Sequence, residues 1–548
     1  MEARRLSRIL WILAGAALAA CSGREENTPD PVVVKDNPIT ISMVTDSVSL
    51  ATGDTVYFEF QVTPYDADFK HDVGAADCAV RMHTEAGSGD NWELVKIEPA
   101  PAYAGPGRYR AFVADKCLRT VYDGRLSFSL TDRYGRSSRT GPAAIHCETN
   151  QQVEDLLATG LTLVVVETVG GEEPTCEYVA HPPGCNGAGT KNATKVPGRV
   201  TVYNGDRVLY HSGGYLKDER GMTIKIRGNT SAYGAKKPFK FKLQKKGDML
   251  GRGNDAKYKD KEWTLLRYDD MRTMVGFKVN ELIGQQWTPA YRIVNLVVNG
   301  DYRGLYMLTE AVKRNTDCRL NVDKTGYVIE YDAYWWNEEV YFTNGWNYSM
   351  AYTFKYPDDE DVTDEQISYI TRFIGEVEGR IRNAGAYEQV IDVPSFAGWL
   401  LACDILGNLD CAGSNLFLTK FDNTDKSKLM MANLWDFDSI YQMNGNWSNV
   451  HNYGAFYYPR LLSNRNTAFK KEYLARWDAV APTIFDQVIS FVDTFAASEE
   501  AAALQASIPL DKKRWGSSLH SIRTNVNTAK NWFSSRKPWL ESAMNSLR

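Results

Sequence analysis

Residues 363–384, TDEQISYITRFIGEVEGRIRNA, mark the point where strand patterns give way to helix patterns along this chain. Thr363 and Gln366 have the spacing of a capping box, in which two side chains and two backbone N–H groups satisfy one another at a helix start. After them isoleucine and valine recur every three or four positions, which makes one face of the predicted helix apolar. Residues 394–408 and 468–495 continue this pattern, so the C-terminal part of the chain is predicted to be helical.

The region before this helix is rich in strand patterns. It opens with LTLVVVETV at 161–169 and includes GRVTVYNGDRVLYHSG at 198–213 and YRIVNLVVNGDYRGLYMLTEAV at 291–312. A sheet-rich part joined to a helical part predicts an α+β fold over residues 151–548, with a cleft between a β-rich lobe and a helical lobe.

A separate all-β unit is expected at residues 39–150. Short alternating segments, such as TVYFEFQVTP at 55–64 and GRYRAFVA at 107–114, are separated there by Asp, Gly and Pro turns. This pattern is typical of an immunoglobulin-like β-sandwich. The unit has no cluster of catalytic residue types, so we interpret it as a spacer or adhesion module.

The N-terminus has the features of an export signal. A basic start and a short apolar run occupy residues 1–20, and the run is shorter than the roughly 20 residues that a bilayer crossing needs. The residues LAAC resemble a bacterial lipobox, which implies that Cys21 is lipidated and that 21–38 form a tether. We expect an outer-membrane lipoprotein, facing the periplasm or, because REE resembles a Bacteroidetes surface-export tag, the outside. An ordinary cleaved signal, giving a soluble periplasmic protein, is the alternative.

Charge and cysteine content narrow the class further. The 548 residues include 63 basic and 68 acidic ones, with a formal charge of -5, and this interspersed balance argues against a nucleic-acid surface. Disulfides are permitted outside the cytosol, and Cys176 with Cys185 is the expected pair. Cys403 lies on an apolar helical face and is expected to be a core thiol.

Two acidic segments suggest a metal site. In LGNLDCAGSNLFL, Asp410 and Asn415 have the spacing of a protein-kinase catalytic loop, although the His-Arg that normally precedes the Asp is absent. In LMMANLWDFDSI, Asp436 and Asp438 follow an apolar strand and would share one side of an extended chain. Carboxylate and amide oxygens suit magnesium. Either segment alone is equally well explained as a polar loop or a solvated strand end.

A third segment supplies cations. KIRGNTSAYGAKKPFKFKL reads as a strand, a glycine-containing hairpin and a second strand, on which Lys240 and Lys242 alternate with phenylalanines. Lysines on a strand beside such a turn can meet nucleotide phosphates, although a solvated basic face is the simpler interpretation. An acidic partner for the lysine is expected, and Glu310 or Glu281 could serve.

These segments together resemble the CotH kinase family, an atypical, secreted protein-kinase-like group. The resemblance covers roughly 157–535 and is carried, in the family's order, by IRGNTSAYGAKKPFKFKL, NLVVNGDYRGLYMLTEAV, LLACDILGNLDCAGSNLFL, LWDFD and YPRLLSNRNTAFKKEYLARW. It implies a catalytic base, magnesium ligands and phosphate-binding residues. The implied catalytic base is Asp410, and the implied magnesium ligands are Asn415, Asp436 and Asp438. The implied phosphate-binding residues are Arg227, Lys240 and Lys242, with Arg272 at the same cleft and Glu310 as the acidic partner.

The resemblance implies an ATP- and Mg²⁺-dependent phosphotransferase that acts on Ser or Thr of an extracytoplasmic protein. One alternative is a catalytically inert lipoprotein that uses the kinase-like domain as a scaffold for a surface ligand. Another is a different nucleotide-dependent transfer at the same site, since fold does not fix reaction. A glycosidase fits less well because lysine-bearing strands accompany the acids, and no GxSxG elbow indicates a serine hydrolase.

Overall fold

The computed structural model describes most of the chain after residue 37. The described residues are 38–51, 55–63, 79–84, 92–115, 122–132, 134–148, 151–185, 187–205, 207–253, 255–343, 345–411, 414–442, 456–463 and 466–548. The predicted signal peptide, Cys21 and the tether lie outside these residues. Within them, none of the helices combines the length and the apolar character that a membrane crossing requires.

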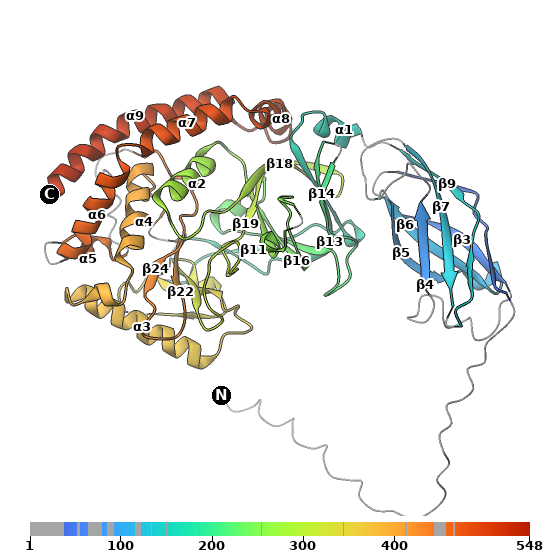
Figure 1. The fold of residues 1–548 in the computed structure, drawn as a ribbon, viewed down its shortest axis with the longest axis horizontal. Coiled ribbons are helices and arrows are strands. Elements are labelled where there is room, and N and C mark those ends of the chain that lie inside the picture. The colour runs from blue at the N-terminus through green and yellow to red at the C-terminus, as the bar shows by residue number, and fades with distance from the viewer. Residues whose placement is uncertain are drawn as a thin grey trace, which may run out of the picture.

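The first part of the chain forms two sheets that pack face to face. Its strands are β1 (Thr40–Met43), β2 (Ser47–Ala51), β3 (Thr55–Thr63), β4 (Ala79–Thr84), β5 (Trp92–Pro99), β6 (Arg108–Asp115), β7 (Tyr122–Thr131), β8 (Ser137–Arg139) and β9 (Ala143–Glu148). One sheet has the order β1-β3-β6-β5 and the other β2-β9-β7-β4, with β8 paired to β7. Phe58 and Phe60 of β3 contact Phe128 of β7 between the sheets. The predicted alternation therefore buries one face of each sheet. Figure 1 shows the arrangement of these strands.

The second β region is an eight-stranded sheet that closes on itself. Its strands are β10 (Thr162–Thr168), β13 (Val196–Asn204), β14 (Arg207–His211), β15 (Met222–Ile226), β16 (Phe239–Gly247), β17 (Asp260–Arg267), β18 (Tyr291–Val298) and β19 (Asp301–Glu310). The order is β10-β18-β19-β17-β16-β15-β13-β14, and β10 also pairs with β13. Closure leaves few free edges and encloses an apolar core.

A short hairpin precedes this barrel's central strands, and its cysteines correct a prediction. The hairpin consists of β11 (Glu177–Val179) and β12 (Gly189–Lys191). Cys176 and Cys185 are free thiols, so the predicted disulfide is wrong. Cys176 packs against the barrel core, whereas Cys185 ends a separate turn in which its N–H donates to the Pro182 carbonyl.

The helical part surrounds a smaller sheet. Its order is β21-β22-β20-β23-β24, formed by β20 (Tyr327–Asp332), β21 (Tyr341–Phe342), β22 (Ala351–Tyr356), β23 (Leu416–Lys420) and β24 (Leu429–Met431). The helices of the described chain are α1 (Gln151–Leu157), α2 (Arg272–Ile283), α3 (Asp364–Arg382), α4 (Val393–Leu406), α5 (Tyr458–Leu461), α6 (Thr467–Val480), α7 (Ile484–Ala496), α8 (Glu499–Trp515) and α9 (Ile522–Leu547). The predicted capping box at Thr363 and Gln366 starts α3. A sheet-rich region followed by a helical one is therefore confirmed.

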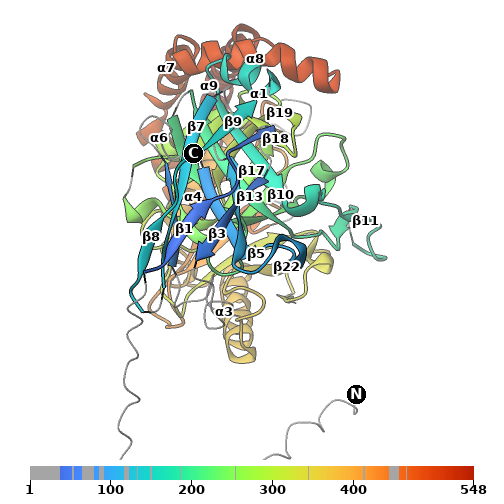
Figure 2. The same cartoon turned by 90° about the vertical axis from the view of Figure 1, so that its right-hand side faces the viewer.

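The last helices connect the helical part to the barrel. Figures 1 and 2 show α7, α8 and α9 along one side of the molecule, with α8 against β19. Asp511 of α8 is fully buried, pairs with Lys236 at 2.7 Å and accepts the Leu305 N–H at 2.7 Å. The ammonium group of Lys236 is therefore used in the contact between the barrel and α8.

Candidate functional site

Three aspartates converge where the segments after α4 and β24 meet. One carboxylate oxygen from each of Asp410, Asp436 and Asp438 can be chosen so that all three lie within 4.8 Å of one another. The convergence does not come from strand alternation, as the sequence suggested, because β24 ends at Met431 and Asp436 has a left-handed backbone with φ of 59°. A turn in the chain brings these carboxylates together.

Burial and neighbouring carboxylates raise the pKa values of Asp436 and Asp410. Burial, followed by the charges of Asp438 and Asp410, raises the pKa of Asp436 to about 7, against the opposing effect of Arg227. Burial and Asp438 raise the pKa of Asp410 to about 6. Such crowding of carboxylates disfavours their ionisation unless a cation compensates. Their hard oxygen donors fit Mg²⁺ or Mn²⁺, so the residues present suit the metal that the family implies.

Asn415 directly precedes β23 and is held by β20, the neighbouring strand of the same sheet. It has a left-handed backbone with φ of 61°, and its N–H donates to Glu330 of β20 at 3.1 Å. Its side-chain amide donates to the Asp410 carbonyl at 3.5 Å. The side chain of Asn415, a predicted metal ligand, therefore lies beside the backbone of Asp410.

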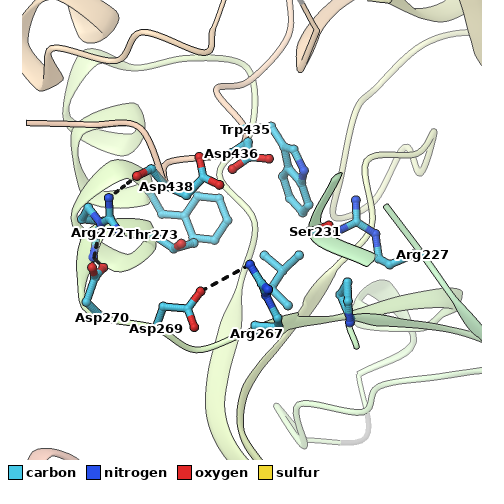
Figure 3. A pocket seen from close by; sticks show the side chains of 13 residues that line it. Arg227, Ser231, Arg267, Asp269, Asp270, Arg272, Thr273, Trp435, Asp436 and Asp438 are labelled. Atoms are coloured by element: carbon cyan, nitrogen blue, oxygen red, sulfur yellow. Dashed lines mark hydrogen bonds and ion pairs between the residues drawn. The ribbon is translucent and has the colours of Figure 1, made fainter. Parts of the chain in front are cut away.

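Arg227 is the cation on the barrel side of this site. It lines a small pocket together with Asp436, Asp438, Ser231 and Arg267 (Figure 3). Its burial lowers its pKa, while Asp436 and Glu330 act in the opposite direction. Among the described residues no hydrogen bond or ion pair involves its guanidinium group, so the group remains available to an anionic ligand.

Arg272 lies at the same pocket but is engaged on two sides. Its Nε donates to Asp270 at 2.7 Å, and another guanidinium N–H donates to the Asp438 carbonyl (Figure 3). This arginine therefore ties the N-terminus of α2 to the segment that carries the acids.

The strand lysines lie further along the same face of the barrel. Phe239 and Phe241 point into the core, so Lys240 and Lys242 point outward, as the alternation predicted. Lys240 is opposite Lys225 in the β15–β16 register, and Arg227 follows two positions after Lys225, directly beyond the end of β15. A row of cations thus follows the outer face of these two strands.

Lys240 has an acidic partner that the sequence did not identify. It pairs with Glu262 of β17 at 2.6 Å. Burial lowers the pKa of Lys240 to about 8, and despite burial Lys240 and Lys313 lower the pKa of Glu262 to about 2. Both groups are therefore charged near neutral pH.

Glu310 and Glu281 are engaged elsewhere. Glu310 is 1% exposed, pairs with Arg252 at 2.9 Å and accepts the Ala290 N–H. It is in register with Trp263, whose side chain lies in the barrel core, so Glu310 is on the opposite face of the sheet from Lys240. Glu281 pairs with Lys278 on its own helix. The expectation that either is the partner of Lys240 is wrong, and the burial of Glu310 leaves it no contact with a ligand.

Glu330 and Lys355 also belong to the site although sequence patterns did not single them out. Glu330 of β20 accepts the Asn415 N–H and pairs with Lys355 of β22 at 3.0 Å. The charges of Glu330, Glu338 and Asp332 raise the pKa of Lys355 in spite of its burial. A charged residue inside the apolar strand YVIEYD was the available signal.

The C-terminal helix braces the loop that carries Asp410. Trp532 donates to the Ile405 carbonyl at 3.0 Å, and the fully buried Arg536 donates to the Asp404 carbonyl at 2.8 Å. These carbonyls belong to the last turn of α4, immediately before the loop. The position of Asp410 therefore depends on residues more than a hundred positions away in sequence.

The fold and site define a protein in which a closed β region and a helical region meet at an acidic, cation-flanked pocket. A family model described as "CotH kinase protein" matches residues 224–540, and the chain belongs to this CotH kinase family. No curated protein matches the chain. The C-terminal domain of the Streptococcus agalactiae AgI/II polypeptide BspA is 10% identical over 31% of this chain and 64% of that one. The TM-score of this match is 0.11, which is too low to indicate a shared fold.

Proposed function

We propose that this protein is an ATP- and Mg²⁺-dependent phosphotransferase of kinase-like fold, acting on hydroxyl groups of an extracytoplasmic protein. The convergence of Asp410, Asp436 and Asp438, next to the pocket that Arg227 lines, carries this proposal. Phosphoryl transfer needs few covalent participants, and this arrangement has the ligands, the base and the cations that it requires.

Each residue has a role that follows from its surroundings. Asp436, with Asp438 and Asn415, would hold the metal, and Asp410 would accept the proton of the attacking hydroxyl. Its pKa of about 6 lies close to neutral pH, where a general base works best. Arg227 and the lysines of β16 bind the phosphates. When bound, Mg²⁺ supplies charge neutralisation at the transferred phosphoryl group.

The rest of the chain fits a role at the cell envelope. In this proposal the lipid on Cys21 anchors the protein to the outer membrane, and the two-sheet unit acts as an immunoglobulin-like spacer. The partner is then a protein of the same compartment, modified on Ser or Thr.

Transfer of labelled γ-phosphate from ATP tests the assignment. The full chain is incubated with envelope proteins and Mg²⁺, beside Asp410→Asn, which keeps the shape of the side chain but removes the base. We expect labelled protein with the wild type and a loss of about 10²–10⁴-fold in the variant. Equal labelling by the two proteins contradicts the assigned base, and no labelling by the wild type favours an inert scaffold.

A further inference from the structure

Asn408 joins the two segments that carry the acids. Its side-chain Nδ2 donates to the Asp436 carbonyl at 3.1 Å, and its Oδ1 accepts the Asp410 N–H at 3.1 Å. The side chain is fully buried. One planar amide therefore holds the backbone of both residues, and its rigid geometry fixes the separation between them.

Backbone hydrogen bonds on either side support this link. The Leu409 N–H donates to the Ser439 carbonyl at 3.2 Å, and the Tyr441 N–H donates to the Leu406 carbonyl at 2.9 Å. Hydrogen bonds thus join the two segments at several positions. The bonds made by the Asn408 side chain are the ones that reach the backbone of Asp410 and Asp436.

The backbone at Asp436 explains why such a link is needed. Its φ of 59° is in the left-handed region, which a residue with a side chain adopts at a cost and keeps only where its surroundings impose it. The close approach of the carboxylates is also unfavourable when they are ionised and no cation is bound. The hydrogen bond to the Asp436 carbonyl helps to offset both costs.

We propose that Asn408 is a positioning residue for the metal, acting through Asp410 and Asp436 rather than as a ligand. This inference rests on the proposed function. The amide fixes the backbone of the metal ligand Asp436 relative to that of Asp410 before the cation arrives. A residue that only stabilised the fold would leave metal affinity unchanged once the protein is folded.

Mn²⁺ binding to the full chain, followed by electron paramagnetic resonance, tests this role. Asn408→Leu has nearly the same size but makes neither hydrogen bond, and Asn408→Ser is a milder change if the first variant fails to fold. Asn466→Leu is the matched control, because Asn466 is also fully buried and bonds to Ser463 before α6, outside the acidic site. Thermal unfolding of each variant reports the structural cost separately.

We expect Mn²⁺ affinity to fall about 10–100-fold in Asn408→Leu, less in Asn408→Ser and not in Asn466→Leu, as for other residues that orient metal ligands. Affinity within twofold of the wild type in both Asn408 variants overturns the inference, as does an equal loss in the control. If the wild type and both Asn408 variants bind Mn²⁺ with affinities within twofold of one another, only the positioning role fails. A wild type that binds no Mn²⁺ overturns this role and the proposed function together.

Discussion

Gly276 of α2 lies so close to the Phe437 ring that a Cβ atom at this glycine would stand 2.2 Å from it. Phe437 separates the two aspartates of the WDFD segment, and its ring packs edge-on against Phe277 at 5.4 Å. The missing side chain at Gly276 therefore allows Phe437 to anchor the acids against α2.

Replacing this glycine tests the anchor. Alanine is normally better than glycine in a helix by about 1 kcal/mol, but here its methyl group meets the aromatic ring. We expect Gly276→Ala to lower the free energy of unfolding by about 1–3 kcal/mol through overpacking, measured by urea denaturation. Gly375→Ala on α3 is the control, because a Cβ there meets nothing within 4 Å, and it should stabilise the protein. Stabilisation by both changes would disprove the anchor.

Glu378 gives the folded protein a pH dependence. Burial raises its pKa from 4.5 to about 7, although Tyr457 donates a hydrogen bond to it at 3.0 Å. The folded state therefore binds this proton more tightly than the unfolded state, so the free energy of unfolding falls as pH rises from about 4.5 to about 7. Glu378→Gln removes this loss and should be more stable than the wild type by about 1–3 kcal/mol at pH 8. Parallel pH profiles of the two proteins would contradict this cause.

The Lys236–Asp511 pair makes the contact between barrel and α8 sensitive to a single charge. Asp511→Asn leaves the buried Lys236 without its counter-ion and should cost about 3–5 kcal/mol in unfolding free energy, measured by denaturant titration. Adding Lys236→Met should recover part of that cost. Asp493→Asn breaks the exposed pair with Lys530 and should cost less than about 1 kcal/mol. Similar costs for the two aspartates would show that burial does not set the strength of the pair.

Local patterns predicted the parts of this structure that depend on neighbouring residues. The sequence predicted both the capping box at Thr363 and the alternation that directs Lys240 outward. The partner of Lys240 was not, because Glu262 meets it only through the register of β16 and β17. Closure of the barrel depends on β10 pairing with two strands that are distant in sequence. Pairings of this kind are decided by the whole sheet, which a local pattern does not contain.

The same limit applies to the site. Asp410 and Asp436 were expected to meet because two weak motifs came in a kinase-like order, and their carboxylates do converge. Asn408, which links them, had no signal of its own, since a buried asparagine and a solvated loop asparagine look alike in sequence.

Isothermal titration of the full chain with ATP tests the central claim most directly, that the acidic site binds a metal–nucleotide complex with Asp436 as a metal ligand. Wild type and Asp436→Asn, which has the same shape but one fewer charge, are titrated with and without Mg²⁺. We predict that Mg²⁺ strengthens ATP binding to the wild type at least tenfold and has little effect on the variant. Equal affinities for the two proteins in the presence of Mg²⁺ would contradict the account.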